Sequence, residues 1–104
     1  MILEHALIDV APDREDAFEE AFDRAAAIIA RSPGFLGARL HRGIERPSRY
    51  LLLVEWERLE DHLQGFRQSA AFTEWRAVLG PFFDGQPAVD HYQSPRYEVA
   101  PAQQ

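Results

Sequence analysis

The chain has 104 residues, a net charge of −6 at neutral pH, and no cysteine, lysine or asparagine. These absences exclude disulfides, thiolate nucleophiles and the lysines of Schiff-base or phosphate-binding sites. No arginine-rich run appears, so the positive surface typical of a nucleic-acid-binding protein is missing. The first ten residues carry Glu4, His5 and Asp9, which is unlike a signal peptide or a membrane span and predicts a cytoplasmic protein.

The length predicts one domain over residues 1–99, followed by a disordered tail over residues 100–104. In the usual scaling, a chain of this size buries only about 60 to 68% of its unfolded surface. We therefore expect it to gain stability from a partner subunit.

The first half of the chain predicts a strand, a helix and a second strand. Residues 2–10 alternate with period two, which is typical of a strand. A helix follows, with Asp13 as its N-cap, and it ends at Pro33 and Gly34. Residues 35–44 alternate again. The side chains expected on the helix-covered face of these two strands are Ala6, Ile8, Val10, Leu36, Ala38 and Leu40.

The second half is organised around the apolar run of residues 51–54. This run is too short for a helix and rich in strand formers, so it predicts a central strand buried on both faces. The apolar period then becomes helical over residues 59–68. Ser69 predicts the N-cap of a second short helix, and residues 88–93 predict a last strand, with a short extension over residues 96–99.

This order of elements, with right-handed crossovers, predicts an α+β, ferredoxin-like βαββαβ domain with a four-stranded antiparallel sheet. The helices cover one face of such a sheet. The open face would carry Leu3, His5, Leu7, Arg39, His41, Leu51, Leu53 and Glu55. Because this set is too apolar for water and too polar for a dry core, we expect a homodimer in which two such faces form a shared barrel.

Glu55 and His62 are the first candidates for catalysis. Glu55 would point into the barrel, either as a general base or in an ion pair with Arg39 or His41. His62 lies on the apolar face of its predicted helix, where it either faces a ligand or is a hydrogen-bonded core histidine. Phe66, on the same helical face, is a candidate substrate contact.

Three further histidines lie on predicted strands: His5, His41 and His91. No spacing typical of metal ligands connects them, so we expect no metal site, and a proton-relay pocket is the better interpretation if they converge. Trp75 and Arg76 would hold an aromatic acid by stacking and a charge-assisted hydrogen bond. The alternative is that Trp75 belongs to the core and that Arg76, like Arg67, is a solvated helix charge.

Two sets of residues resemble one known family. The run Pro33-Gly34-Phe35-x-Gly37 and the later Val54-Glu55-Trp56-Glu57, followed by a histidine-bearing helix, are similar to the antibiotic biosynthesis monooxygenases over residues 2–93. The second half resembles a branch of that family that has Gly65-Phe66-Arg67, Trp75-Arg76 and His91-Tyr92. The resemblance implies a dimeric α+β barrel and an oxygenase that uses no metal or flavin cofactor.

The expected function is therefore a cofactor-independent monooxygenase acting with O2 on a small aromatic, quinol-like or anthrone-like metabolite. A base removes an acidic proton and the resulting anion reduces O2 itself. The alternative is a dimer of the same fold that binds a small molecule without catalysis or isomerises it. The haem-degrading relatives depend on an asparagine that this chain lacks, so haem is at most a ligand here.

Overall fold

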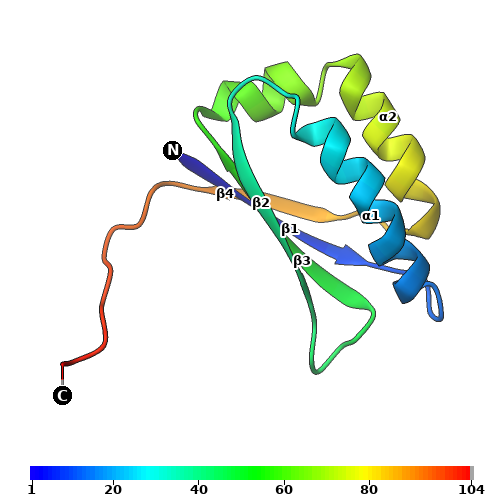
Figure 1. Cartoon of the computed structure of the whole chain (residues 1–104), viewed down its shortest axis with the longest axis horizontal. Helices are drawn as coiled ribbons and strands as arrows, with labels where there is room; N and C mark the ends of the chain where they lie inside the picture. The colour runs from blue at the N-terminus through cyan, green and yellow to red at the C-terminus, as the bar shows by residue number, and fades with distance from the viewer. Residues whose placement is uncertain (104) are drawn as a thin grey trace.

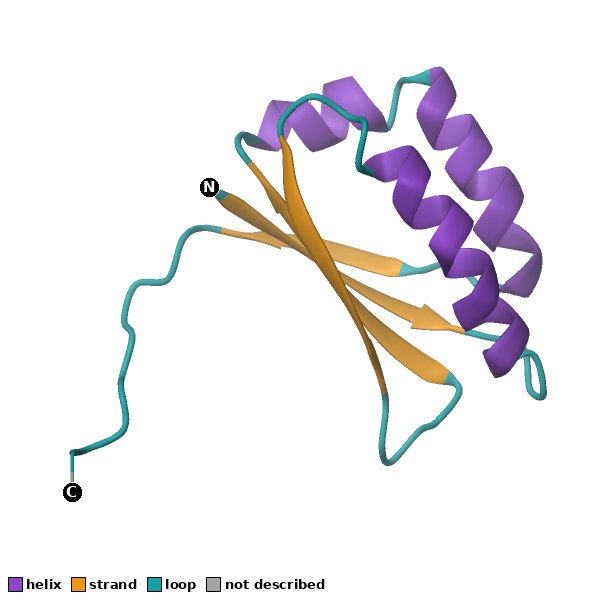
Figure 2. Ribbon diagram, in the orientation of Figure 1, coloured by secondary structure: helices purple, strands orange, loops and turns teal. Residues whose placement is uncertain are grey.

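A computed structural model describes residues 1–103 of the chain. Its elements are β1 (Ile2–Asp9), α1 (Glu15–Ile29), β2 (Phe35–Arg42), β3 (Arg49–Trp56), η1 (Asp61–Phe66), α2 (Ala70–Leu79), η2 (Gly80–Phe82) and β4 (Ala88–Tyr92). The strands form one antiparallel sheet in the order β2-β3-β1-β4. Figures 1 and 2 show the helices together on one side of this sheet. The predicted ferredoxin-like α+β fold is confirmed.

The core lies between the helices and the covered face of the sheet. Ala6 pairs with Leu52 and Ile8 pairs with Tyr50, so the apolar alternation of β1 and β3 is in register. The helix α1 packs its buried face against them with Phe18, Ala21, Ala25, Ile28 and Ile29. Trp56, at the end of β3, is 0% exposed.

The open face carries the set predicted from the alternation. Leu3, His5 and Leu7 of β1 lie opposite Glu55, Leu53 and Leu51 of β3. Arg39 and His41 of β2 join the same face opposite Leu53 and Leu51. No element of residues 1–103 lies across this face in Figures 1 and 2.

The placement of Leu36 in the core was wrong. A β-bulge lies between Phe35 and Gly37, so Phe35 pairs with Trp56 while Gly37 pairs with Glu55. Phe35 therefore takes the covered position and packs edge-on against the Trp56 ring, at 5.8 Å between centroids. Leu36 is displaced and 51% exposed. Beyond the bulge, Ala38 and Leu40 lie opposite Val54 and Leu52, on the predicted face.

The segment after β3 is a π-helix over Asp61–Phe66 rather than the regular helix predicted for residues 59–68. Its wider turn is closed by the bond from Arg67 N to His62 O, at 2.9 Å. The turn is anchored by Asp61, whose carboxylate accepts from the Arg58 backbone N–H at 3.0 Å. Gly34 (φ +82°) lies against that carboxylate, and an added Cβ there would overlap it. Such π turns are frequent at functional sites.

The two predicted helix caps differ in outcome. Ser69 is the N-cap of α2, and its hydroxyl accepts from the Phe72 backbone N–H at 3.2 Å, as predicted. Asp13 is not the N-cap of α1. It takes a left-handed conformation (φ 66°), and Arg14 holds the cap position without a side-chain hydrogen bond. Asp tolerates this backbone region better than most residues, which explains the tight turn before α1.

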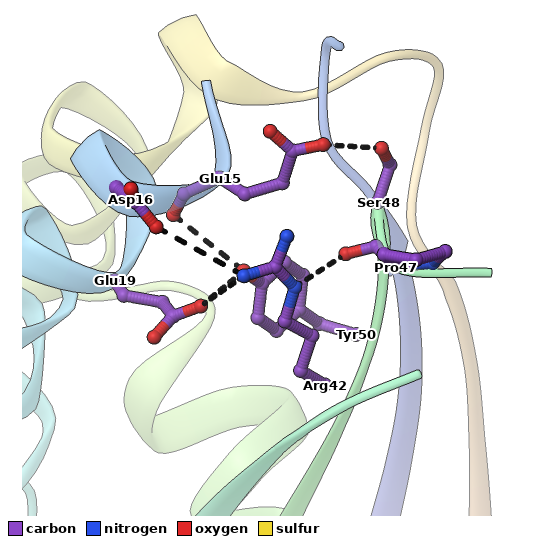
Figure 3. A network of polar contacts seen from close by, with 7 residues as sticks. All are labelled: Glu15, Asp16, Glu19, Arg42, Pro47, Ser48 and Tyr50. Atoms are coloured by element: carbon purple, nitrogen blue, oxygen red, sulfur yellow. Dashed lines mark hydrogen bonds and ion pairs between the residues drawn. The ribbon is translucent and has the colours of Figure 1, made fainter. Parts of the chain in front are cut away.

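A polar network ties the β2–β3 hairpin to the start of α1 (Figure 3). Arg42 donates to Pro47 O at 2.8 Å and lies 3.5 Å from the Glu19 carboxylate. The Tyr50 hydroxyl donates to the same carboxylate, and Ser48 donates to Glu15. We call these side chains, with Asp16, the hairpin network.

The last residues leave the sheet as an extended segment, which Figure 1 shows pointing away from the body. Ser94 Oγ donates to Met1 O at 3.1 Å at its start. Residues 96–99 form no strand, contrary to the expected extension, and residues 100–103 are without helix or strand. Residue 104 of the predicted tail lies outside the described residues. Within residues 1–103, none of the helices has the length and apolar character needed to cross a membrane.

Candidate functional site

A cavity of about 300 Å³ lies between the covered face of the sheet and the helical layer. Its volume is at the lower end of the range for small-molecule sites. Strands β1 and β3, the π-helix η1, helix α2 and the segment before β4 all contribute to it. The lining residues are Glu4, Ala6, Ile8, Ile29, Leu52, His62, Phe66, Arg67, Phe72, Trp75, Arg76, Phe83, Gln86, Pro87 and Val89.

Glu4 is a carboxylate on the apolar side of a strand. It alternates with Ala6 and Ile8, so the pleat of β1 directs it under the helices, where it is 6% exposed. Its Oε1 accepts from Trp56 Nε1 at 2.9 Å and lies 3.3 Å from His62 Nε2. Among residues 1–103, no hydrogen bond to its Oε2 is found, and no fully buried side-chain oxygen or nitrogen lacks a partner. Glu4 lines the cavity, so we take Oε2 as the oxygen that faces a ligand.

His62 connects this carboxylate to the edge of the sheet. The side chain is 4% exposed and stacks on the Trp56 ring at 5.3 Å between centroids. Its Nδ1 lies 2.7 Å from Nε2 of His91 on β4. His91 is the register partner of Glu4, which places it on the covered side. We call Glu4, Trp56, His62 and His91 the buried cluster.

Burial sets the protonation of the buried cluster. Loss of water raises the pKa of Glu4, although the Trp56 hydrogen bond and the positive Arg67 oppose this. Burial, together with His91 and Arg67, lowers the pKa of His62 to about 4. Burial and Arg67 also lower the pKa of His91. Both imidazoles are therefore neutral at pH 7.

Neutral imidazoles carry one donor each, which fixes the direction of the hydrogen bonds when Glu4 is ionised. In the tautomer with the hydrogen on His62 Nε2, which lies 3.3 Å from Glu4 Oε1, His62 Nδ1 accepts from His91 Nε2–H. The three side chains form a row from the cavity wall to His91, which is only partly buried.

The structure separates the sequence-predicted candidates into two groups. His62, Phe66, Trp75 and Arg76 line the cavity, and His91 is bonded to His62. His5, Arg39, His41 and Glu55 lie on the open face of the sheet and do not line it. A second, shallower hollow lies there, between Gly37, Ala38, Arg39, Leu53 and Glu55.

The three strand histidines do not converge. His5 pairs with Asp90 while Glu4 pairs with His91, so His5 and His91 point to opposite faces. His5 packs instead against the Tyr92 ring, at 5.8 Å between centroids. Within residues 1–103, no group of three or more His, Asp or Glu side chains is placed to hold a metal ion.

Sequence reasoning missed Glu4 and the contact of Arg67 with the cavity. Glu4 shares the parity of Ala6 and Ile8, so a carboxylate on the apolar side of β1 was the available signal. Arg67 gave no such signal. Its approach to the cavity depends on the π turn, which shifts the side chains that follow it relative to a regular helix.

The family profile described as antibiotic biosynthesis monooxygenase matches residues 1–78. This match covers β1 through nearly all of α2. The chain belongs to the antibiotic biosynthesis monooxygenase family. Among curated proteins, the uncharacterised protein YczJ of Bacillus subtilis (strain 168) is 43% identical over 93 residues, which cover 89% of this chain and 98% of that protein.

Solved structures of this family have the same fold. One is a protein of Bordetella bronchiseptica described as an antibiotic biosynthesis monooxygenase, with 45% identity and a TM-score of 0.87 over 90% of this chain and 96% of that one. Another is SnoaB of Streptomyces nogalater, described as a cofactor-independent oxygenase. It has 19% identity and a TM-score of 0.79 over 92% of this chain and 94% of its own, a likeness of fold alone.

Proposed function

We propose that this family member is a cofactor-independent monooxygenase of a small, electron-rich aromatic compound, with Glu4 as the base. The observation that carries the proposal is Glu4 itself: a buried carboxylate that accepts a hydrogen bond from Trp56 at Oε1 and lines an aromatic-walled cavity. Burial raises the pKa of Glu4, which makes the carboxylate a stronger base than one in water. His62, bonded to His91, lies beside this carboxylate and remains neutral.

The first step is proton removal. Glu4 Oε2 takes a proton from a methylene held between two aromatic rings, or from a phenol, and leaves an electron-rich anion. Protonated Glu4 keeps this proton beside the substrate, because the neighbouring His62, with a pKa lowered to about 4, is a weak proton acceptor.

The second step uses O2 as the oxidant. The anion gives one electron to O2, and the resulting superoxide and substrate radical combine into a C–O bond, which forms a peroxide. The peroxide takes up a proton and loses water as the second C–H bond breaks. Overall, CH2 and O2 give C=O and H2O, so the electrons come from the substrate and no other reductant is consumed.

The cavity walls suit such an intermediate. Phe66, Phe72 and Trp75 line the cavity with aromatic rings that exclude water from a carbanion or radical. Phe66 packs edge-on against both Phe72 and Trp75, which holds the wall rigid. The description of SnoaB as a cofactor-independent oxygenase makes O2 chemistry the first activity to test.

A second candidate function is proton transfer without O2. Glu4 is sufficient by itself to take a proton from one carbon and return it to another in an isomerisation, or to bind an ionisable aromatic. A substrate whose double bond moves, or whose α-proton exchanges with deuterium, while oxygen stays constant would favour this function.

The test is oxygen uptake with a panel of anthrones, hydroquinones and flavonols. We expect uptake by the wild-type protein, a loss of about 10² to 10⁴-fold in Glu4→Gln, and a smaller loss in His62→Gln. Glu57→Gln, an exposed carboxylate after β3, is the matched control. Glu55→Gln tests the carboxylate of the open face in the same assay. If activity is lost in Glu55→Gln and retained in Glu4→Gln, the base is on the open face. No uptake with any substrate would contradict the oxygenase.

We also propose that two copies associate through their open faces. Leu3, Leu7, Leu51 and Leu53 share this face, and each contributes roughly 1.5 to 3 kcal/mol when fully buried, before the costs of association. The polar groups beside them include both signs of charge, Arg39 and Glu55, as a self-complementary face requires.

Light scattering at micromolar concentration tests the dimer. Leu53→Asp puts a charge at the centre of the open face and should give a folded monomer. Ala27→Asp, on the exposed side of α1, should remain dimeric. A monomeric wild type, or a folded dimer of Leu53→Asp, would contradict the assignment of this face.

A further inference from the structure

We infer that the aromatic ligand of the cavity is a carboxylate, which Arg67 and Arg76 bind at its edge. This inference rests on the proposed function in taking the cavity as the substrate site. It adds the chemical class of the substrate: a planar aromatic ring system with an acid group at one end and the reactive carbon at the other.

Arg67 is held beside the buried cluster by the π-helix. Its backbone N–H closes the last turn of η1 on His62 O, and its neighbour Phe66 is 2% exposed against Trp56. The guanidinium is close enough to influence the charge states of Glu4, His62 and His91. In residues 1–103 it makes no ion pair within 4.0 Å with a carboxylate, so its positive charge is available to a ligand.

Arg76 approaches the same cavity from α2. Its guanidinium carbon lies 5.8 Å from the centre of the Phe72 ring, a cation–π contact that holds the long side chain along the cavity wall. Across the described part of the chain, no carboxylate pairs with Arg76, whereas Arg31, Arg42, Arg49 and Arg58 all have acidic partners. Among the arginines of residues 1–103 that have no acidic partner, Arg67 and Arg76 are the two that line the cavity.

The charge of the cavity is opposite to that of the chain. The chain carries −6, yet the ionisable lining residues are Arg67, Arg76, Glu4 and the neutral His62. The only lining carboxylate is the deep one, and it is already bonded to Trp56. An anion at the edge would therefore meet two guanidinium groups, and the planar fork of each suits the two oxygens of a carboxylate.

Aromatic side chains line the same cavity as the arginines and the base, among them Phe72 and Trp75. A ring packed against them would share the cavity with the Glu4 carboxylate. The acid group, bound by the arginines, would then fix the orientation of the ring relative to Glu4. A neutral ring would have the same wall contacts without this anchor.

The experiment measures binding without turnover, under nitrogen, by calorimetry. The probes are 2-naphthoate and the neutral amide of similar shape, 2-naphthamide. We expect 2-naphthoate to bind at least about tenfold more tightly than 2-naphthamide, from charge-assisted hydrogen bonds. The Arg67→Gln/Arg76→Gln double variant should lose this preference and retain amide binding. Arg24→Gln, an exposed arginine of α1, is the control.

Folding of the double variant is checked by circular dichroism, and Arg67→Lys/Arg76→Lys should restore part of the preference because it restores the charge. Equal affinity for the two probes would overturn the inference and leave the cavity as the site. Binding of neither probe would also overturn it, while oxygen uptake by wild type would show that the proposed function survives. Preferred binding of 2-naphthoate without any oxygen uptake would support the inference against the oxygenase.

Discussion

Two polar clusters join the sheet to the helices, and they are built on opposite principles. The hairpin network lies near the solvent, and each of its charges meets an opposite charge or a hydroxyl, as Arg42 does with Glu19. The buried cluster places the Glu4 carboxylate beside two neutral histidines and an indole. Its only positive neighbour, Arg67, is at the edge of the cavity.

The difference shows which cluster is built for stability. Each salt bridge near the surface contributes little to the free energy of unfolding, and its charges need not leave water. The hairpin network therefore holds the β2–β3 hairpin against α1 with only a small effect on stability. A carboxylate under a helical layer is destabilising unless it is fully compensated, and Glu4 is compensated in part. Groups of this kind with shifted pKa values and an adjoining cavity are typical of functional sites.

The largest expected effect is on stability, from Trp56→Ala in the buried cluster. Trp56 is 0% exposed and contacts Phe35, His62 and Phe66 as well as Glu4. Its removal leaves a cavity and an uncompensated carboxylate, so the free energy of unfolding should fall by about 3 to 5 kcal/mol. In the hairpin network, Tyr50→Phe should cost only about 0.5 to 1.5 kcal/mol. Urea denaturation of both variants checks this, and equal losses would remove the distinction.

The pH dependence of stability is the next largest effect. The folded-state pKa of His62 is about 4 against an ordinary value of 6.5, so the unfolded chain binds a proton first as pH falls. The contribution of His62 to the free energy of unfolding is fully present above pH 6.5 and is lost progressively as the pH falls to about 4. Between pH 7 and pH 5 this loss is about 2 kcal/mol. His91 acts in the same direction, and Glu4, with its raised pKa, acts in the opposite one.

The hairpin network should lose stability only at lower pH. The Ser48 hydrogen bond lowers the pKa of Glu15 below its ordinary value of 4.5, so its contribution is lost only as pH falls below that range. Unfolding free energies measured between pH 7 and 5 should therefore decrease in wild type and change less in His62→Gln. The same slope in both proteins would assign the effect to other groups.

A smaller effect of opposite sign is expected for Glu4→Gln. The amide oxygen still accepts from Trp56 Nε1, and no charge remains to be buried, so the variant should be more stable by about 1 kcal/mol at pH 7. Its oxygen uptake should be lost. Higher melting temperature together with lost activity would mark Glu4 as a functional residue, whereas lower stability would make it a structural one.

The smallest effect concerns the pair of Arg42 and Glu19. A double-mutant cycle with Arg42→Ala and Glu19→Ala should give a coupling of about 0.2 to 1 kcal/mol. Salt at 0.5 M should reduce it, because exposed charges are screened. A coupling above about 2 kcal/mol that resists salt would mean that the hairpin network is as important for stability as the buried cluster.

The fold could be predicted because its signals are local. Period-two alternation over β1 and β3 and the Ser69 cap of α2 depend on neighbouring residues alone. The bulge at Leu36 and the π turn at His62 could not be predicted in the same way. Each inserts one residue into a regular period in response to tertiary contacts, which the sequence pattern does not record.

The candidate site was predicted in part for the same reason. His62, Phe66, Trp75 and Arg76 follow helical spacing, and all four line the cavity. The choice of Glu55 rather than Glu4 came from expecting the pocket on the open face. The alternation placed Glu55 on the open face and left Glu4 unassigned, and only the packed helices show that the cavity is on the side of Glu4.

The four histidines allow one measurement to test which face holds the site. His5 and His41 lie on the open face, and His62 and His91 lie in the buried cluster. Side-chain ¹⁵N spectra of the imidazoles report all four in one sample, and 2-naphthoate is titrated into it under nitrogen. We predict that the His62 and His91 signals shift with the ligand and stay those of neutral imidazoles at pH 7, while His5 and His41 do not respond. Shifts of His5 and His41 alone would place the site on the open face and contradict the role of Glu4.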